Sequence, residues 1–381
     1  MSNNLSLEAQ KQLIKRGFSR RSFGRFATLL TAGATLPFYN EAAMAQLSQM
    51  ANVPADAVRI NANENPLGPC KEAAEAMHGI IQRGGRYLYE ETGDFTKTLA
   101  DIEGVKPSYI MPFAGSSDPL HRSVLAFCSP TKPLIVADPG YEAAGRAAEY
   151  ISAKTYQVKL TANYSHDVKA MVAASPNAGM IYICNPNNPS GTTTSRADIE
   201  WALANKPAGS ILVLDEAYLH FSDQQAGTDF VAKDKDVVVL RTFSKLFGMA
   251  GLRAGAAIAR PDLLEKLKPF SAGALPVTGM IGAKTSLEQK YLIPQRKKDM
   301  RNVRTETFSF LDKHNVKFIA SDSNCFMMDA KRPAKEFMSA MLNEKVLVGR
   351  AWPSMPTYSR ITVGTKEEMA KFQTALLKVM A

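Results

Sequence analysis

The stretch RTFSKLFGMAGLRAG, residues 241–255, directly follows the apolar run of residues 237–240. An apolar run without polar alternation is typical of a strand that is buried on both faces, as in a parallel sheet. The stretch then places Lys245 between two phenylalanines, with Arg253 eight residues further on. Because ligands bind at the carboxyl ends of the strands in such sheets, we expect both side chains to face a ligand there.

Other parts of the chain carry the same pattern. Apolar runs at residues 133–137, 180–184, 211–214 and 256–259 alternate with helical stretches. This predicts an α/β class, with a large domain over residues 76–270 whose mostly parallel sheet is flanked by helices. Beyond it, amphipathic helices at residues 296–314, 334–344 and 366–380 predict a smaller α+β C-terminal domain over residues 271–381. We interpret residues 46–75 as an N-terminal arm.

Residues 1–45 resemble a twin-arginine export signal. Arg20 and Arg21 precede a mildly apolar segment, residues 26–38, and Ala43-Met44-Ala45 offers a cleavage sequence. The apolar segment is too short to cross a bilayer of ~30 Å, so no stable membrane anchor is expected. The signal predicts export by the twin-arginine machinery to the periplasm or beyond, with a mature protein from near Gln46. The alternative is a basic amphipathic helix in a cytoplasmic protein.

Composition narrows the function classes. The 381 residues are 45% hydrophobic and carry a formal charge of +10, but the basic residues are scattered, so nucleic-acid binding is not expected. The four cysteines lie far apart and the five histidines lack metal-ligand spacing. This predicts buried free thiols and no metal site.

Polar residues follow several of the apolar runs. Asp215 follows residues 211–214, Asn188 follows residues 180–184, and Tyr218 comes three residues after Asp215. One interpretation of Asp215 and Lys245 is a structural ion pair, but such pairs seldom repay their desolvation. The further convergent groups favour a ligand site.

Together these residues resemble the fold-type I pyridoxal-phosphate enzymes, class I and II aminotransferases, and most closely the histidinol-phosphate aminotransferase branch. The resemblance covers roughly residues 58 to 370. It is carried by seven stretches in the family's order: 61–69 (NANENPLGP), 86–87 (RY), 115–118 (GSSD), 184–191 (CNPNNPSG), 215–218 (DEAY), 242–245 with 251–253 (TFSK, GLR), and 359–365 (SRITVGT).

The resemblance implies a role for each matching residue. Lys245 holds the cofactor aldehyde as a Schiff base, Asp215 keeps the pyridine nitrogen protonated, and Tyr218 bonds the phenolic oxygen. These three are the predicted catalytic residues. The other implied cofactor-binding residues are Asn188 at the same oxygen, Tyr141 on the ring face, and Gly115, Ser116, Ser117, Thr242, Ser244 and Arg253 at the phosphate. For Tyr141, simple core packing is the alternative.

The resemblance also implies residues for the partner subunit and the substrate. Tyr87 matches a tyrosine that reaches the neighbouring subunit's phosphate, which implies a homodimer, although Leu88 replaces the family's usual proline. Arg360 matches the arginine that binds the α-carboxylate. Arg350 and Asn65 are further substrate candidates, and a surface salt bridge is the alternative for Arg350. The unusual segment after Arg350, with Trp352, favours an apolar pocket.

The predicted function is therefore transfer of an amino group between an L-amino acid, or an amino-alcohol phosphate, and a 2-oxo acid. Two alternatives stay open at this point. One is a pyridoxal-phosphate decarboxylase of a phosphorylated amino acid, which shares these motifs. The other is a non-catalytic exported ligand-binding protein. An export signal fits histidine biosynthesis poorly, so the substrate is left open.

Overall fold

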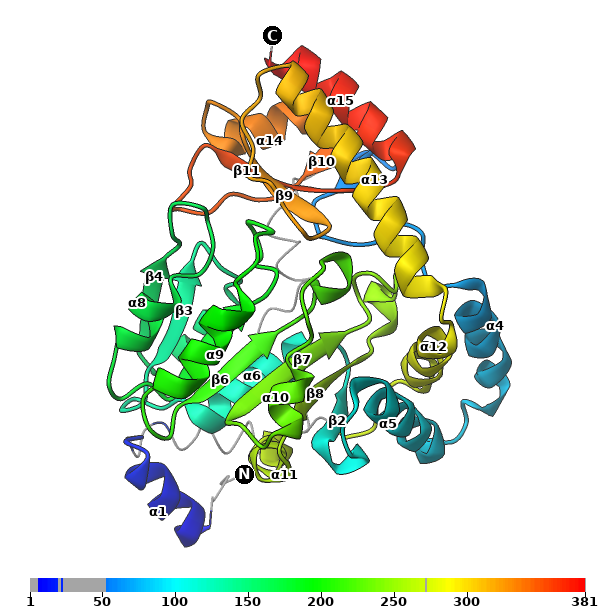
Figure 1. Ribbon diagram of the computed structural model, residues 1–381. Coiled ribbons are helices and arrows are strands. Elements are labelled where there is room, and N and C mark those ends of the chain that lie inside the picture. The colour runs from blue at the N-terminus through cyan, green and yellow to red at the C-terminus, as the bar shows by residue number, and fades with distance from the viewer. Residues whose placement is uncertain (1–5, 20–21, 23–52, 271–272, 381) are drawn as a thin grey trace.

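The computed structural model of the chain describes residues 6–19, 22, 53–270 and 273–380 (Figure 1). The arginine pair, the apolar segment 26–38, the Ala43-Met44-Ala45 sequence and Gln46 lie outside these residues, so the export signal stays a prediction. Within the described ranges, none of the helices combines the length and the apolar character that a membrane span requires.

A mixed β-sheet forms the centre of the large domain. Within the described residues it has seven strands, in the spatial order β2 (Ile110–Phe113), β8 (Gly255–Ala259), β7 (Val237–Thr242), β6 (Ile211–Asp215), β5 (Met180–Cys184), β3 (Leu134–Asp138) and β4 (Thr155–Lys159). Strand β8 runs in the direction opposite to the other six strands. The α/β class with a mostly parallel sheet is therefore confirmed.

The central strands are apolar because both faces of the sheet are covered. Every residue of β5, β6, β7 and β8 is buried. In Figure 1, α9 (Arg196–Asn205) and α10 (Thr228–Ala232) lie in front of the sheet, and α6 (Ser117–Phe127) lies behind it. The register pairs Cys184 with Asp215 and Asp215 with Leu240, so the carboxyl ends of three strands meet at one edge.

Three helices pack together beside the sheet. Helix α12 (Val277–Glu288) packs against α4 (Lys71–Ile80) and α5 (Tyr89–Glu103). Its Met280 and Ala283 belong to the same apolar core as the sheet. By packing, α12 therefore lies with the large domain, although the sequence boundary at residue 270 assigns it to the small one.

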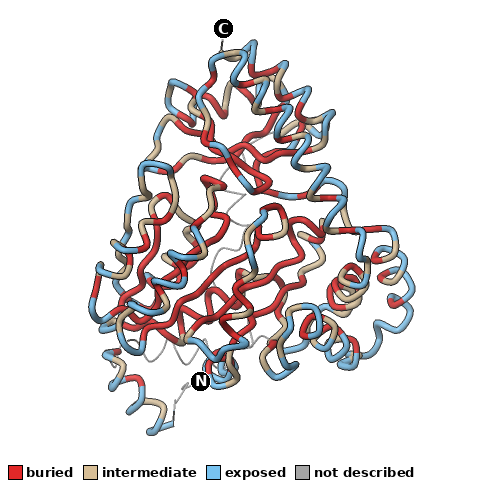
Figure 2. Tube along the Cα trace, in the orientation of Figure 1, coloured by how far each residue is buried: buried red, intermediate tan, exposed pale blue. Residues whose placement is uncertain are grey.

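The small domain has its own apolar core, visible as a second buried region in Figure 2. Helices α13 (Leu292–Lys313), α14 (Ala334–Asn343) and α15 (Lys366–Met380) surround the antiparallel pair β9 (Cys325–Asp329) and β11 (Tyr358–Thr362). Strand β10 (Val346–Val348) pairs in parallel with β1 (Val58–Ile60). Part of the predicted N-terminal arm is thus a strand of the small domain.

A short N-terminal helix, α1 (Leu7–Lys15), packs against the large domain. The Arg16 guanidinium donates hydrogen bonds to the carbonyls of Leu125 at 2.6 Å and Cys128 at 2.9 Å, at the C-terminal end of α6. Leu13 and Phe18 are buried in the large domain's core. These residues precede the predicted arginine pair and lie within the predicted leader.

Candidate active site

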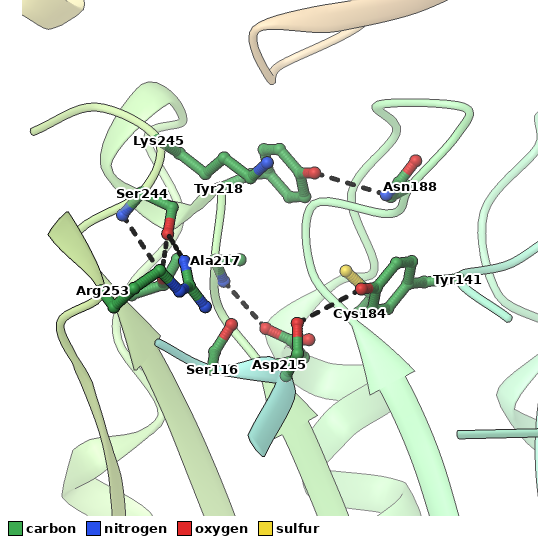
Figure 3. A pocket seen from close by; sticks show the side chains of 12 residues that line it. Ser116, Tyr141, Cys184, Asn188, Asp215, Ala217, Tyr218, Ser244, Lys245 and Arg253 are labelled. Atoms are coloured by element: carbon green, nitrogen blue, oxygen red, sulfur yellow. Dashed lines mark hydrogen bonds between the residues drawn. The ribbon is translucent and has the colours of Figure 1, made fainter. Parts of the chain in front are cut away.

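A pocket lies at the carboxyl ends of β5, β6 and β7, where the sequence predicts a ligand site (Figure 3). It has about 400 Å³ of empty space, counting its open mouth. Its lining residues are Ser116, Ser117, Tyr141, Cys184, Asn188, Asp215, Ala217, Tyr218, Thr242, Ser244, Lys245 and Arg253. Ten of these are predicted site residues, drawn together from five separate stretches of the chain.

Lys245 reaches into the pocket from the loop after β7. Its side chain is 5% exposed, and Nζ lies 5.6 Å from the ring centroid of Tyr218. Figure 3 shows the amine extending toward that ring. The two neighbouring phenylalanines, Phe243 and Phe247, pack on each other with centroids 4.6 Å apart. They form apolar support beneath the loop, and the ring beside the amine is that of Tyr218.

Asp215 ends strand β6 and both of its carboxylate oxygens accept hydrogen bonds. The Tyr182 hydroxyl donates to Oδ2 at 2.9 Å, and the backbone N–H of Ala217 donates to Oδ1 at 3.1 Å. Burial, reinforced by the Asp215 charge, holds the pKa of Tyr182 well above its usual value. The phenol therefore stays protonated and available as a donor. The same two causes raise the pKa of Cys184, whose thiol also lines the pocket.

Tyr218 is held by two amides. Asn63 Nδ2 donates to its hydroxyl oxygen at 3.0 Å, and Asn188 Nδ2 does so at 3.3 Å. Arg360 fixes the orientation of Asn188 by donating to its Oδ1 at 2.8 Å. The predicted carboxylate-binding arginine is thus linked to the cofactor pocket through one side chain.

Hydroxyls and a guanidinium gather at one end of the pocket. Ser116 precedes helix α6 and makes no capping hydrogen bond with its side chain. Thr242 lies 3.0 Å from the Ser244 hydroxyl, which also accepts from Arg253 Nη1 at 3.2 Å. Ser117 bonds the Tyr141 hydroxyl at 3.3 Å. This combination of a helix N-terminus, hydroxyls and one cation suits a phosphate.

At this end of the pocket, the close approach of Gly115 and Arg253 requires an unusual backbone conformation of both residues. Gly115 has φ +94°, and an added Cβ would lie 2.2 Å from Arg253 Nη2. Arg253 itself has φ +56°, in the left-handed region that non-glycine residues seldom adopt. Such backbone strain persists where the surrounding structure holds it, and here it directs the guanidinium to Ser244.

Five predicted residues do not line this pocket in the single chain. Gly115 and Arg360 lie against the lining residues Arg253 and Asn188, as described above. The other three lie elsewhere. Tyr87 is 71% exposed and stacks on Tyr89. Asn65 donates to the carbonyl of Leu246 at 2.8 Å, which holds the loop that carries Lys245. Arg350 is buried and pairs with Glu142 at 2.9 Å. Their predicted contacts with a partner subunit or a substrate stay predictions.

Sequence reasoning missed three residues that shape the site: Asn63, Tyr182 and Glu142. Asn63 lies two residues before the predicted Asn65, in the same quoted motif. Tyr182 is the one hydroxyl inside an otherwise apolar strand, which was a usable signal. Glu142 follows Tyr141 directly, but its partner Arg350 is 208 residues away along the chain.

The residues present fit pyridoxal phosphate. The cradle at Gly115, which a Cβ would fill, and the Ser244–Arg253 pair match a phosphate, while Asp215 offers an anion for a protonated ring nitrogen. Lys245 supplies an amine in the same pocket. One pocket therefore has the complementary group for each end of that molecule.

Comparisons with known proteins agree with this geometry. The family described as "Aminotransferase class I and II" matches residues 55–376. The histidinol-phosphate aminotransferase of Symbiobacterium thermophilum is 30% identical over 328 residues, covering 84% of this chain and 90% of that protein. Histidinol-phosphate aminotransferase 1 of Cupriavidus pinatubonensis is 32% identical over 340 residues, covering 86% and 89%.

Solved structures show the same fold. A putative histidinol-phosphate aminotransferase from Erwinia carotovora superposes with a TM-score of 0.82 at 29% identity, covering 86% of this chain and 98% of that one. The histidinol-phosphate aminotransferase of Sinorhizobium meliloti, in complex with pyridoxal-5'-phosphate, gives 0.80 at 22% identity, covering 95% and 99%.

Proposed function

Because the chain belongs to the aminotransferase class I and II family, we propose that it moves amino groups between an L-amino acid, or an amino-alcohol phosphate, and a 2-oxo acid. It is a pyridoxal-phosphate-dependent transaminase. The observation that carries the assignment is the convergence of Lys245, Asp215 and Arg253 on one pocket.

Each residue is assigned a task that its surroundings suit. The cofactor supplies an electron sink that acidifies the α-hydrogen of the bound amine. Lys245 moves the proton at the α-carbon. Asp215 holds the ring nitrogen, and Arg360 holds the α-carboxylate with its planar guanidinium. Tyr218 donates its proton toward the phenolic oxygen, because its own oxygen already accepts from Asn63 and Asn188.

Covalent attachment of the cofactor tests the assignment of Lys245. The purified chain is incubated with pyridoxal phosphate, reduced with borohydride, and mapped by peptide mass spectrometry. We expect the label on Lys245 and its loss in Lys245→Ala, together with loss of transamination. The matched control is Lys206→Ala, which removes another lysine of low side-chain exposure (8%) that pairs with Asp236 elsewhere. An unlabelled wild type, or a label that persists in Lys245→Ala, would overturn the proposal.

The decarboxylase alternative is separated by its product. An assay of the wild type with amino donors follows oxo-acid formation and carbon dioxide release in the same reaction. We expect oxo acid in step with amino-donor loss and no carbon dioxide above the Lys245→Ala background.

We further propose a homodimer in which Tyr87 reaches the partner's pocket. Four large apolar side chains in residues 67–89 are more than half exposed: Leu67, Ile81, Tyr87 and Tyr89. Tyr87 and Tyr89 stack on each other, and exposed apolar groups that lie together are typical of an interaction surface. Mixing Lys245→Ala with Tyr87→Ala tests it, since heterodimers would contain one complete site. We expect the mixture to regain activity that neither variant has alone, and a monomer by sedimentation would contradict the proposal.

Export by the twin-arginine route is also proposed, on the sequence pattern at residues 19–45. Changing Arg20 and Arg21 together to lysine, followed by cell fractionation, tests it. We expect the double variant to stay in the cytoplasm. A wild type confined to the cytoplasm, or a double variant that is exported like it, would show that the leader has been misinterpreted.

A further inference from the structure

Two arginines that the sequence predicts as substrate residues, Arg350 and Arg360, contact one tryptophan. Strand β11 carries Arg360, and its backbone N–H donates to the carbonyl of Arg350 at 3.2 Å. The guanidinium carbons lie 4.8 Å (Arg350) and 5.6 Å (Arg360) from the ring centroid of Trp352. Trp352 therefore contacts both guanidinium groups and connects them.

Glu142 balances the charge of Arg350. Arg350 Nη2 lies 2.9 Å from Glu142 Oε2, and the two side chains are 9% and 34% exposed. Glu142 immediately follows Tyr141, which lines the cofactor pocket. The ion pair thus connects Arg350 to the segment that carries Tyr141. Among the described residues, Arg350 Nε has no hydrogen-bond partner, so the guanidinium still has donor capacity.

The surroundings of Glu142 add negative charge. A groove beside Tyr141 is lined by three carboxylates, Asp138, Glu142 and Glu149, against a single guanidinium, that of Arg146. A phosphate monoester carries about −1.5 to −2 charges near neutral pH, whereas an α-carboxylate carries one. A dianion beside this groove would meet like charge, and it would have to displace Glu142 to gain Arg350.

We propose that Glu142 is a specificity-determining residue that selects an α-amino acid over an amino-alcohol phosphate. By neutralising Arg350, it leaves the anion site suited to the single charge of an α-carboxylate at Arg360. The inference rests on the proposed function, which allows two classes of amino donor, and it selects one of them. The proposed amino donor therefore differs from the substrate that appears in the names of the histidinol-phosphate aminotransferase relatives.

Two ligands with the same imidazole side chain test the proposal. Histidinol phosphate carries a phosphate where L-histidine carries the α-carboxylate. Their dissociation constants are measured by calorimetry on the cofactor-loaded wild type, on Glu142→Gln and on Glu149→Gln. Glu149→Gln is the matched control, because Glu149 lines the same groove without bonding Arg350.

We expect the wild type to bind L-histidine more tightly than histidinol phosphate. Glu142→Gln should bind histidinol phosphate at least about tenfold more tightly than the wild type, the scale of one charge-assisted hydrogen bond. Glu149→Gln should change the ratio of the two affinities less than about twofold. Cofactor absorbance like that of the wild type would show that Glu142→Gln is folded.

Two results would overturn the inference: a wild type that prefers histidinol phosphate, or a Glu142→Gln variant with no gain in phosphate affinity. Both results differ from failure of the proposed function. If the proposed function were wrong, the wild type would not take up the cofactor at Lys245, and the borohydride experiment would detect this independently.

Discussion

Tyr182 and Asp215 lie on neighbouring strands and form a buried hydrogen bond of 2.9 Å, with the phenol as donor. This bond stabilises the ionised carboxylate, which has to face a protonated ring nitrogen. Because burial keeps the pKa of Tyr182 well above its usual value, the phenol stays protonated and remains a donor at any pH below about 10.

Tyr182→Phe should therefore weaken cofactor binding. Removing one hydrogen bond to a charged acceptor costs about 1.5 kcal/mol, which corresponds to roughly a tenfold rise in the dissociation constant. Titration of the apoprotein with pyridoxal phosphate measures it, and the increase should be the same at pH 6 and pH 9. Tyr156→Phe is the control, since Tyr156 bonds Lys154 at an exposed position. Equal dissociation constants for Tyr182→Phe and the wild type would refute the role of this bond.

Asn63 should hold the Tyr218 hydroxyl together with Asn188. Its amide is fully buried, donates to Tyr218, and accepts from the Thr362 hydroxyl at 3.0 Å. Asn63→Ala should lower kcat about tenfold by releasing the Tyr218 hydroxyl. A double-mutant cycle measures the coupling: in a Tyr218→Phe background the same change should have a much smaller effect on kcat. Additive losses would mean that Asn63 acts elsewhere.

The sequence predicted the sheet where its strands are buried on both faces. The run at residues 180–184 is strand β5 residue for residue, because continuous burial demands continuous apolar character. The edge strand β4 was not predicted, since its residues are half-buried or exposed and include Thr155, Gln157 and Lys159. An edge strand that is only partly buried has a mixed polar and apolar sequence, which a loop can also have.

The pocket was predictable to the extent that strand ends are predictable. Asp215 and Lys245 follow apolar runs, so their meeting at one edge follows from parallel topology. Glu142 and Arg350 meet only through the packing of the small domain on the large one. Asn63 occupies a left-handed backbone conformation with φ 54°, and no local pattern distinguished it from Asn65. Contacts over such sequence separations leave no periodic signal.

Acid should destabilise the fold through His166. This buried imidazole lies 2.8 Å from the Thr194 hydroxyl, and burial lowers its pKa to about 4. The unfolded chain binds a proton near pH 6.5 and the folded chain does not, so this stabilisation is complete above pH 6.5. It is lost as the pH falls toward 4, by about 2 kcal/mol at pH 5.

Urea unfolding at pH 5 and pH 7 measures this difference. In His166→Gln the loss of stability between the two pH values should be about 2 kcal/mol smaller than in the wild type. His78→Gln, at an exposed position, is the control and should reproduce the wild-type difference. An unchanged pH dependence in His166→Gln would assign acid sensitivity to other groups.

Arg16 should hold the front of the chain on the folded large domain. The last carbonyls of a helix lack partners within the helix. The Arg16 guanidinium donates to two of them in α6, those of Leu125 and Ala126, and to the carbonyl of Cys128 just beyond the helix. Arg16→Ala should release residues 7–18, lower the unfolding free energy by about 1–3 kcal/mol, and leave the core of the sheet intact. Hydrogen–deuterium exchange measures the release as faster amide exchange in this segment.

Arg16→Lys should retain part of the protection, and Lys11→Ala, on the exposed side of α1, should retain all of it. Rapid exchange of residues 7–18 in the wild type would show that the helix does not stay bound to α6 in solution.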